Sequence, residues 1–158
     1  MKKMPGVLCP NCVAGVGCQI YETRPEVCRE HYCGWRHLAL LDDSWRPDLS
    51  NIYVELKYLS AQDYSGFTAA HPTGLRITLL GELSAEHTEL LAANIASLVA
   101  GDIPVVLTVA GPPEQMRGAL LLNPILKPYP SDKAAFAEAL AVVFRACRDL
   151  PAQPYAFS

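Results

Sequence analysis

Five cysteines gather near the N-terminus of this 158-residue sequence, and their spacing is its clearest chemical signal. They are Cys9, Cys12, Cys18, Cys28 and Cys33, spaced C-x2-C-x5-C-x9-C-x4-C. Between the first two stand Pro10 and Asn11, which favour a tight turn that can aim two sulfurs at one point. Clustered thiolates of this kind are ligands for zinc or for iron. The spacing therefore predicts metal ligation by this cluster.

A disulfide framework is the alternative use of clustered cysteines. It requires an oxidising compartment and usually an even number of cysteines. The cluster has an odd number, and Pro5, Cys9 and Pro10 interrupt what would be the apolar region of a secretory signal. We therefore expect a cytoplasmic protein with reduced cysteines, in which redox-active thiols are the remaining alternative to metal ligands.

Cysteine spacing does not decide which metal is bound. Zinc in a closed site of four sulfurs would be structural, because catalytic zinc keeps one position open for water. An iron–sulfur cluster also takes four thiolates, although the ferredoxin run C-x2-C-x2-C-x3-C is absent. Five cysteines for four positions leave one spare, which would suit ligand exchange in metal storage or delivery. His31 could replace a thiolate, but a packed or solvated histidine is the commoner case.

A long and specific pattern surrounds the later cysteines. It runs Gly17-Cys18-Gln19-Ile20-Tyr21-Glu22-Thr23-Arg24-Pro25-Glu26-Val27-Cys28-Arg29 and continues to Cys33-Gly34-Trp35 and to Trp45-Arg46-Pro47-Asp48. Over roughly residues 5 to 50, the chain resembles the zinc- or iron-chelating domain family that is named for its CxxCxxCC motif and that includes flagellin lysine N-methylases.

This resemblance implies a bacterial protein that binds zinc or iron through its cysteines. Cys18, Cys28 and Cys33 match the core motif, and Cys9 and Cys12 match the leading pair. The family's leading element has three or four close cysteines, whereas this chain keeps two before Cys18. Methylase activity is not implied, because the remaining chain has no cofactor-binding fingerprint.

Charged and aromatic residues accompany the cysteines. Three arginines could offset the negative charge of a metal with four thiolates, or pair with neighbouring glutamates: Arg24, Arg29 and Arg36. Because about forty residues make little core on their own, we expect four aromatic side chains to form an apolar shell over the metal site: Tyr21, Tyr32, Trp35 and Trp45. The metal would then stabilise this lobe substantially.

The remainder of the chain predicts a scaffold with the order ββαββα. Alternating apolar residues indicate strands over 51–59 and 75–79, joined by a polar connection. Ser84 is a predicted N-cap for a helix over 85–100 that Gly101 ends. A buried strand over 105–109, a short strand over 119–122 and a helix over 133–149 follow.

The sixth cysteine belongs to the last predicted helix. It lies on an apolar stripe made by Phe136, Leu140, Val143, Cys147 and Leu150. A free cysteine on such a stripe behaves as a small buried apolar residue. We therefore exclude Cys147 from the metal site.

The predicted fold class is α+β, in one compact unit. A small Cys-rich metal-binding N-terminal lobe, residues 1–50, is packed on a ββαββα-like domain, residues 51–150, and a loosely held tail covers 151–158. No apolar run reaches the roughly 18 to 20 residues that span a bilayer. The net charge of −3, from 13 Lys and Arg against 16 Asp and Glu, is not gathered in blocks, so neither nucleic acid nor a membrane is an expected partner.

The predicted function is a cytoplasmic metal-binding protein, with zinc or iron held in a mainly structural role or for binding an unknown protein partner. An iron–sulfur redox protein on the same ligands is one alternative. An enzyme related to protein lysine N-methylation is another. Motifs for hydrolases and zinc proteases, G-x-S-x-G and H-E-x-x-H, are absent, and His71 and His87 have the settings of surface residues.

Overall fold

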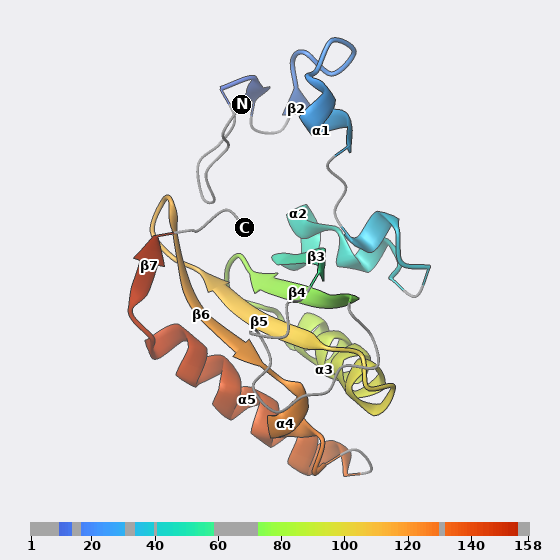
Figure 1. The fold of residues 1–158 in the computed structure, drawn as a ribbon, viewed down its shortest axis with the longest axis vertical. Helices are drawn as coiled ribbons and strands as arrows, with labels where there is room; N and C mark the ends of the chain where they lie inside the picture. The colour runs from blue at the N-terminus through green and yellow to red at the C-terminus, as the bar shows by residue number, and fades with distance from the viewer. Residues whose placement is uncertain are drawn as a thin grey trace.

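A five-stranded sheet with the order β3-β4-β5-β6-β7 is the main body of the protein (Figure 1). This computed structural model describes residues 10–13, 17–30, 34–39, 41–58, 73–129 and 132–154. The strands of the sheet are β3 (Ile52–Tyr58), β4 (Thr73–Leu79), β5 (Val105–Ala110), β6 (Gln115–Leu121) and β7 (Ala152–Pro154). Strands β4 and β5 are parallel, and the other neighbours are antiparallel.

Helices cover one face of this sheet (Figure 1). Helix α3 (Ala85–Ala100) makes the crossover that parallel strands β4 and β5 require, and α4 (Asn123–Leu126) and α5 (Lys133–Asp149) connect β6 to β7. Asp132 caps α5 by accepting hydrogen bonds from the amides of Ala134 and Ala135, both at 3.0 Å. Within the described ranges, no helix is both long and apolar enough to cross a membrane.

The core lies between the helices and the sheet. Val54, Ile77 and Leu107 stand in register on three neighbouring strands, and all three are buried. From the helices, the predicted stripes supply the opposite side of the core: Leu91, Ile95, Leu98, Phe136, Leu140, Val143 and Cys147. The mixed α+β fold is thus confirmed, and the predicted elements occur in the predicted sequence with α4 and β7 in addition.

The opposite face of the sheet, here called the second face, carries the alternate residues of each strand. Register places Glu55 opposite Arg76, and Thr78 opposite Thr108, on this face. The hydroxyls of Thr78 and Thr108 are 2.8 Å apart, and both threonines are buried. Hydrogen bonding between the two hydroxyls satisfies polar groups that burial would otherwise leave without water.

The C-terminal strands differ from the prediction. β6 begins at Gln115 rather than 119, because a β-bulge and the positive φ of Gly118, +62°, interrupt the alternation that marks a strand. The expectation of a loose tail is wrong for Ala152–Pro154, which pairs with β6. The Arg117 guanidinium stabilises the approach to β7 by donating to the Leu150 carbonyl at 2.9 Å. The predicted connection over 60–72 and the end of the tail lie outside the described residues.

Several of the described residues between 34 and 50 pack against the core of the sheet unit. They form η1 (Gly34–Arg36), η2 (Asp43–Trp45) and α2 (Pro47–Ser50), and η1 lies against β3. Trp45 is only 2% exposed within the same apolar cluster as Val54, and Trp35 packs against that cluster. The expected place of Trp45 in a shell over a metal is therefore wrong, because this indole is buried in the core of the sheet unit.

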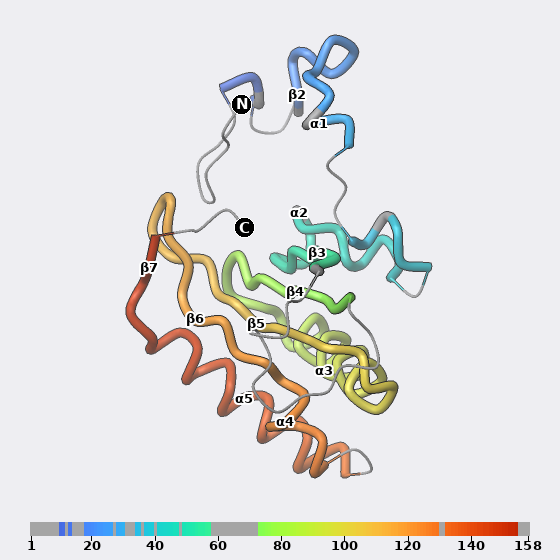
Figure 2. Tube along the Cα trace, viewed as in Figure 1, coloured from blue at the N-terminus to red at the C-terminus, as the bar shows by residue number. Residues whose placement is uncertain are grey.

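The first elements of the chain stand apart from the sheet, as the tube in Figure 2 shows. They are β1 (Cys12–Val13), β2 (Gly17–Cys18) and α1 (Glu26–Glu30). All three are short, and they carry three of the five clustered cysteines. These three elements therefore carry candidate ligands of the predicted metal site.

Candidate metal centre

Strands β1 and β2 bring two of the candidate ligand positions face to face. They pair in antiparallel register, with Cys12 opposite Cys18 and Val13 opposite Gly17. The amide of Gln19 donates to the Asn11 carbonyl at 2.8 Å and extends this hairpin by one hydrogen bond. Directly opposed residues of an antiparallel pair have Cα atoms about 4.5 to 5.5 Å apart. Two cysteines separated by five residues in the chain are thereby neighbours in space.

Cys28 lies in the first turn of α1, which follows the hairpin. Its amide donates to the Pro25 carbonyl at 2.9 Å, so the proline begins the helix and sets the position of the cysteine. Cys28 is half-buried and Cys18 is exposed, and both are free thiols. Neither thiol is enclosed in an apolar core, so both stay available to a metal ion or a reagent.

Arg29 holds the segment between Cys18 and Cys28 together. Its Nε donates to the Arg24 carbonyl at 3.0 Å, and its Nη2 donates to the Glu22 carbonyl at 3.1 Å. This guanidinium therefore binds backbone carbonyls, and within the described residues it does not form the alternative ion pair with a glutamate side chain. The loop over 22–24 is tied to the helix that carries Cys28.

Tyr21 does not form part of an apolar shell. Its side chain is 53% exposed, and the guanidinium carbon of Arg24 lies 4.0 Å from the centre of its ring. An exposed cation–π contact of this kind stabilises by about 0.5 to 1 kcal/mol. The predicted apolar cover over the cysteines is thus wrong for Tyr21 as well as for Trp45.

The remaining candidate ligands lie outside what the structure describes. These are Cys9, His31 and Cys33, together with the side chain of Cys12. Within the described part of the chain, no three His, Cys, Asp or Glu side chains converge in a way that could hold a metal ion. Two of the five cysteine positions are therefore placed in register, and the full ligand set stays a prediction.

Cys147 is buried in the core, as predicted, whereas Cys18 is exposed and Cys28 is half-buried. The Cys147 side chain is fully buried, and its Sγ lies 3.6 Å from the Arg117 carbonyl oxygen and 3.8 Å from that of Leu107. Burial raises the pKa of the Cys147 thiol, because the thiolate would lose its hydration. Cys147 therefore stays protonated and acts as a core residue.

His87 also has a structural role. Its amide donates to Ser84 Oγ at 3.1 Å, and its Nδ1 lies 3.0 Å from the same oxygen. Ser84 is the N-cap of α3, so His87 completes that cap. His71 lies outside the described residues.

Sequence reasoning missed a cavity of about 460 Å³ that lies among strands β3 to β7. Lys57 and Arg76 line it together with residues of the C-terminal strands. The available signal was the alternation in β3 and β4, which puts these two cations on one face. This alternation does not by itself indicate a binding site, because outward-facing charges are ordinary on a half-exposed strand.

No family model, no curated protein and no solved structure matches this chain. The resemblance of residues 5 to 50 to the CxxCxxCC family therefore stays a prediction that depends on the residues themselves.

Proposed function

We propose that this protein binds zinc through its clustered cysteines, in a mainly structural role or one of binding a protein partner. The proposed ligands come from Cys9, Cys12, Cys18, Cys28 and Cys33. The observation that supports the proposal best is the register of the β1–β2 pair, in which Cys12 stands opposite Cys18. A turn with a cysteine on each arm is a common way to present two thiolates to one tetrahedral ion.

A structural role follows from the size of the elements. β1 and β2 have two residues each and α1 has five, too few for independent stability. Two apolar side chains of this segment, those of Val13 and Tyr21, are exposed rather than packed. A metal that joins the hairpin to α1 would supply the cross-link that a small core cannot.

Metal content tests the proposal directly. The untagged protein is purified without oxygen, and its metals are measured by mass spectrometry beside its visible spectrum. We expect about one zinc per chain and no colour, as a closed thiolate site predicts. Iron with labile sulfide and a brown absorption would instead favour the iron–sulfur alternative. A protein with no bound metal, and no affinity for added zinc, would contradict the proposal.

Two cysteine variants and one control distinguish cysteines that bind zinc from a cysteine that does not. Cys18→Ser and Cys28→Ser are expected to lose zinc, whereas Cys147→Ala removes a thiol from the sheet core and should retain it. Amide hydrogen exchange then reports where structure is lost. Cys28→Ser should lose protection in residues 17–30 and keep it in β4 and β5. If zinc is lost while exchange in residues 17–30 stays unchanged, the metal has no structural role.

The alternative of an enzyme related to lysine N-methylation makes a different prediction. It requires binding of a methyl donor, and S-adenosylmethionine is the probe. Calorimetric titration of the zinc-loaded protein with this compound is expected to show no binding. Saturable binding would favour the enzyme over the structural role.

A further inference from the structure

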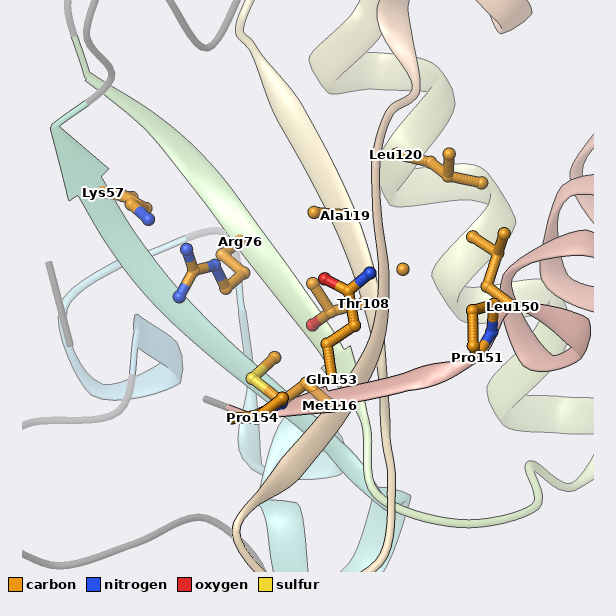
Figure 3. Close-up of a pocket in the computed structure, with 11 residues that line it drawn as sticks. Lys57, Arg76, Thr108, Met116, Ala119, Leu120, Leu150, Pro151, Gln153 and Pro154 are labelled. Atoms are coloured by element: carbon orange, nitrogen blue, oxygen red, sulfur yellow. The ribbon is translucent and has the colours of Figure 1, made fainter. Parts of the chain in front are cut away.

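The cavity lies on the second face of the sheet. Register places five of its lining residues on that face, one from each strand: Lys57, Arg76, Thr108, Met116 and Gln153. Figure 3 shows Lys57 and Arg76 on one side of the cavity and Leu150 and Pro151 on the other, with Thr108 between them. The volume of about 460 Å³ is within the range of small-molecule sites, which is about 300 to 1,000 Å³.

A β-bulge creates the hollow. The pairing of β5 with β6 shifts from Leu107 opposite Leu120 to Val109 opposite Arg117, so two residues of β6 stand opposite Thr108. These two are Gly118 and Ala119, which both line the cavity and have the smallest side chains of the strand. Bulges are frequent beside binding sites, because they redirect side chains and open the ladder.

At the charged end of the cavity, the Arg76 guanidinium has hydrogen-bond donors that are not satisfied within the described part of the chain. Arg76 Nε is buried and has no hydrogen-bond partner among the described residues. Within the described part of the chain, this guanidinium forms an ion pair from Nη1 to Glu55 Oε2 at 3.6 Å, which is beyond hydrogen-bond distance. An unsatisfied buried donor is costly. Because Nε itself is closed to solvent, a bound anion would take its hydrogen bonds from the outer Nη donors of Arg76.

The charges here favour an anion. Lys57 and Arg76 contribute two positive charges, and Glu55 offsets one, so one net positive charge remains. A guanidinium presents its donors in a planar fork that matches carboxylate and phosphate oxygens. Thr108 and Gln153 add neutral polar groups to the lining.

The opposite end of the cavity is apolar. Met116, Leu150, Pro151 and Pro154 supply its walls, and Leu150 is 37% exposed although it is a large apolar side chain. Exposed apolar surface beside a cationic pocket suits a ligand that has both an anionic group and a hydrocarbon part.

We infer that this cavity binds a small organic anion, a carboxylate or a phosphate monoester, with its oxygens on Arg76 and Lys57 and its hydrocarbon part against Met116, Leu150 and Pro151. The inference is independent of the metal proposal, because the two involve different residues.

Octanoate and octyl phosphate are the probes, and 1-octanol is the uncharged control. Binding is measured by titration calorimetry, and chemical shifts of the amides of β4 to β7 locate it. We expect both anions to bind and 1-octanol to bind about tenfold more weakly or not at all, since a charged hydrogen bond is worth roughly that factor. Preference for octanoate or for octyl phosphate identifies the anionic group. Equal affinity for 1-octanol would overturn the inference.

Three variants test the residues. Arg76→Gln should weaken anion binding about tenfold or more, and Arg145→Gln, an equal charge change at an exposed position of α5, should not change it. Ala119→Leu narrows the hollow without altering charge, and it should also weaken binding. Circular dichroism checks that each variant is folded. If Arg76→Gln and Ala119→Leu are both folded and bind as the parent does, the cavity is not the site.

Discussion

The sulfur of Cys147 packs directly against the backbone of Gly118, so that a Cβ atom at position 118 would lie 2.5 Å from Cys147 Sγ. Gly118 also has a φ of +62°, a conformation that other residues adopt only with strain. This contact joins the last helix to the bulge of β6, and the bulge forms the hollow on the second face. The buried thiol of Cys147 and the cavity are therefore structurally coupled.

Gly118→Ala is expected to destabilise the protein by about 2 to 4 kcal/mol, because strain in φ adds to overpacking against the sulfur. Urea unfolding followed by circular dichroism measures the change. Gly101→Ala is the matched control, since a Cβ there meets its nearest atom at an ordinary 3.5 Å. The double variant Gly118→Ala, Cys147→Ala should recover part of the loss. Equal stability of the two alanine variants at 118 and 101 would contradict the described packing.

Stability should depend on pH through the Cys147 thiol. Its pKa is raised in the folded protein by burial, so the folded state holds the proton more tightly than the unfolded state does. The stabilisation is complete below the ordinary thiol pKa, about 8.5, and it is lost as the pH rises from there towards the raised value. Between about pH 8 and pH 10, the metal-free protein should lose more stability than its Cys147→Ala variant. Parallel pH profiles of the two proteins would show that this thiol does not contribute.

The pair of threonine hydroxyls on the second face should behave as a unit. Thr78→Val leaves Thr108 with a weaker partner, the Ile77 carbonyl at 3.4 Å, and we expect a loss of about 1 to 2 kcal/mol. Replacing both threonines with valine removes donor and acceptor together, so the double variant should cost less than the sum of the two single variants. A double-mutant cycle in urea measures this coupling, and strict additivity would rule it out.

Trp45→Ala should cost about 3 to 5 kcal/mol, because this indole fills the sheet core with only 2% of its surface exposed. Tyr21→Ala, at a side chain that is 53% exposed, should cost less than about 1 kcal/mol. Thermal unfolding of the metal-free protein compares the two. If Trp45→Ala affected zinc content and left the stability of the metal-free protein unchanged, Trp45 would belong to the metal lobe instead of the core.

Local patterns predicted the elements that depend on neighbours in the chain. The alternation from Ile52 onward marked β3, and Ser84 and Gly101 marked the ends of α3. Of the predicted apolar stripe of α5, Phe136, Leu140, Val143 and Cys147 are buried, whereas Leu150 is exposed beyond the end of the helix. These features are readable because capping and helical periodicity act within a few residues.

Features that join distant segments were not readable in the same way. Parallel pairing of β4 with β5, the return of Ala152–Pro154 to β6 and the packing of Trp45 on the sheet depend on which surfaces meet after the chain has folded. The candidate metal centre shows the same division. The types and spacing of its cysteines determined the expected chemistry, whereas the pairing of β1 with β2 decided that Cys12 stands opposite Cys18. At the cavity, the pairing of β3 with β4 decided that Lys57 and Arg76 share one face. The physical reason is that residue type sets what a side chain can bind, but only long-range packing sets its neighbours.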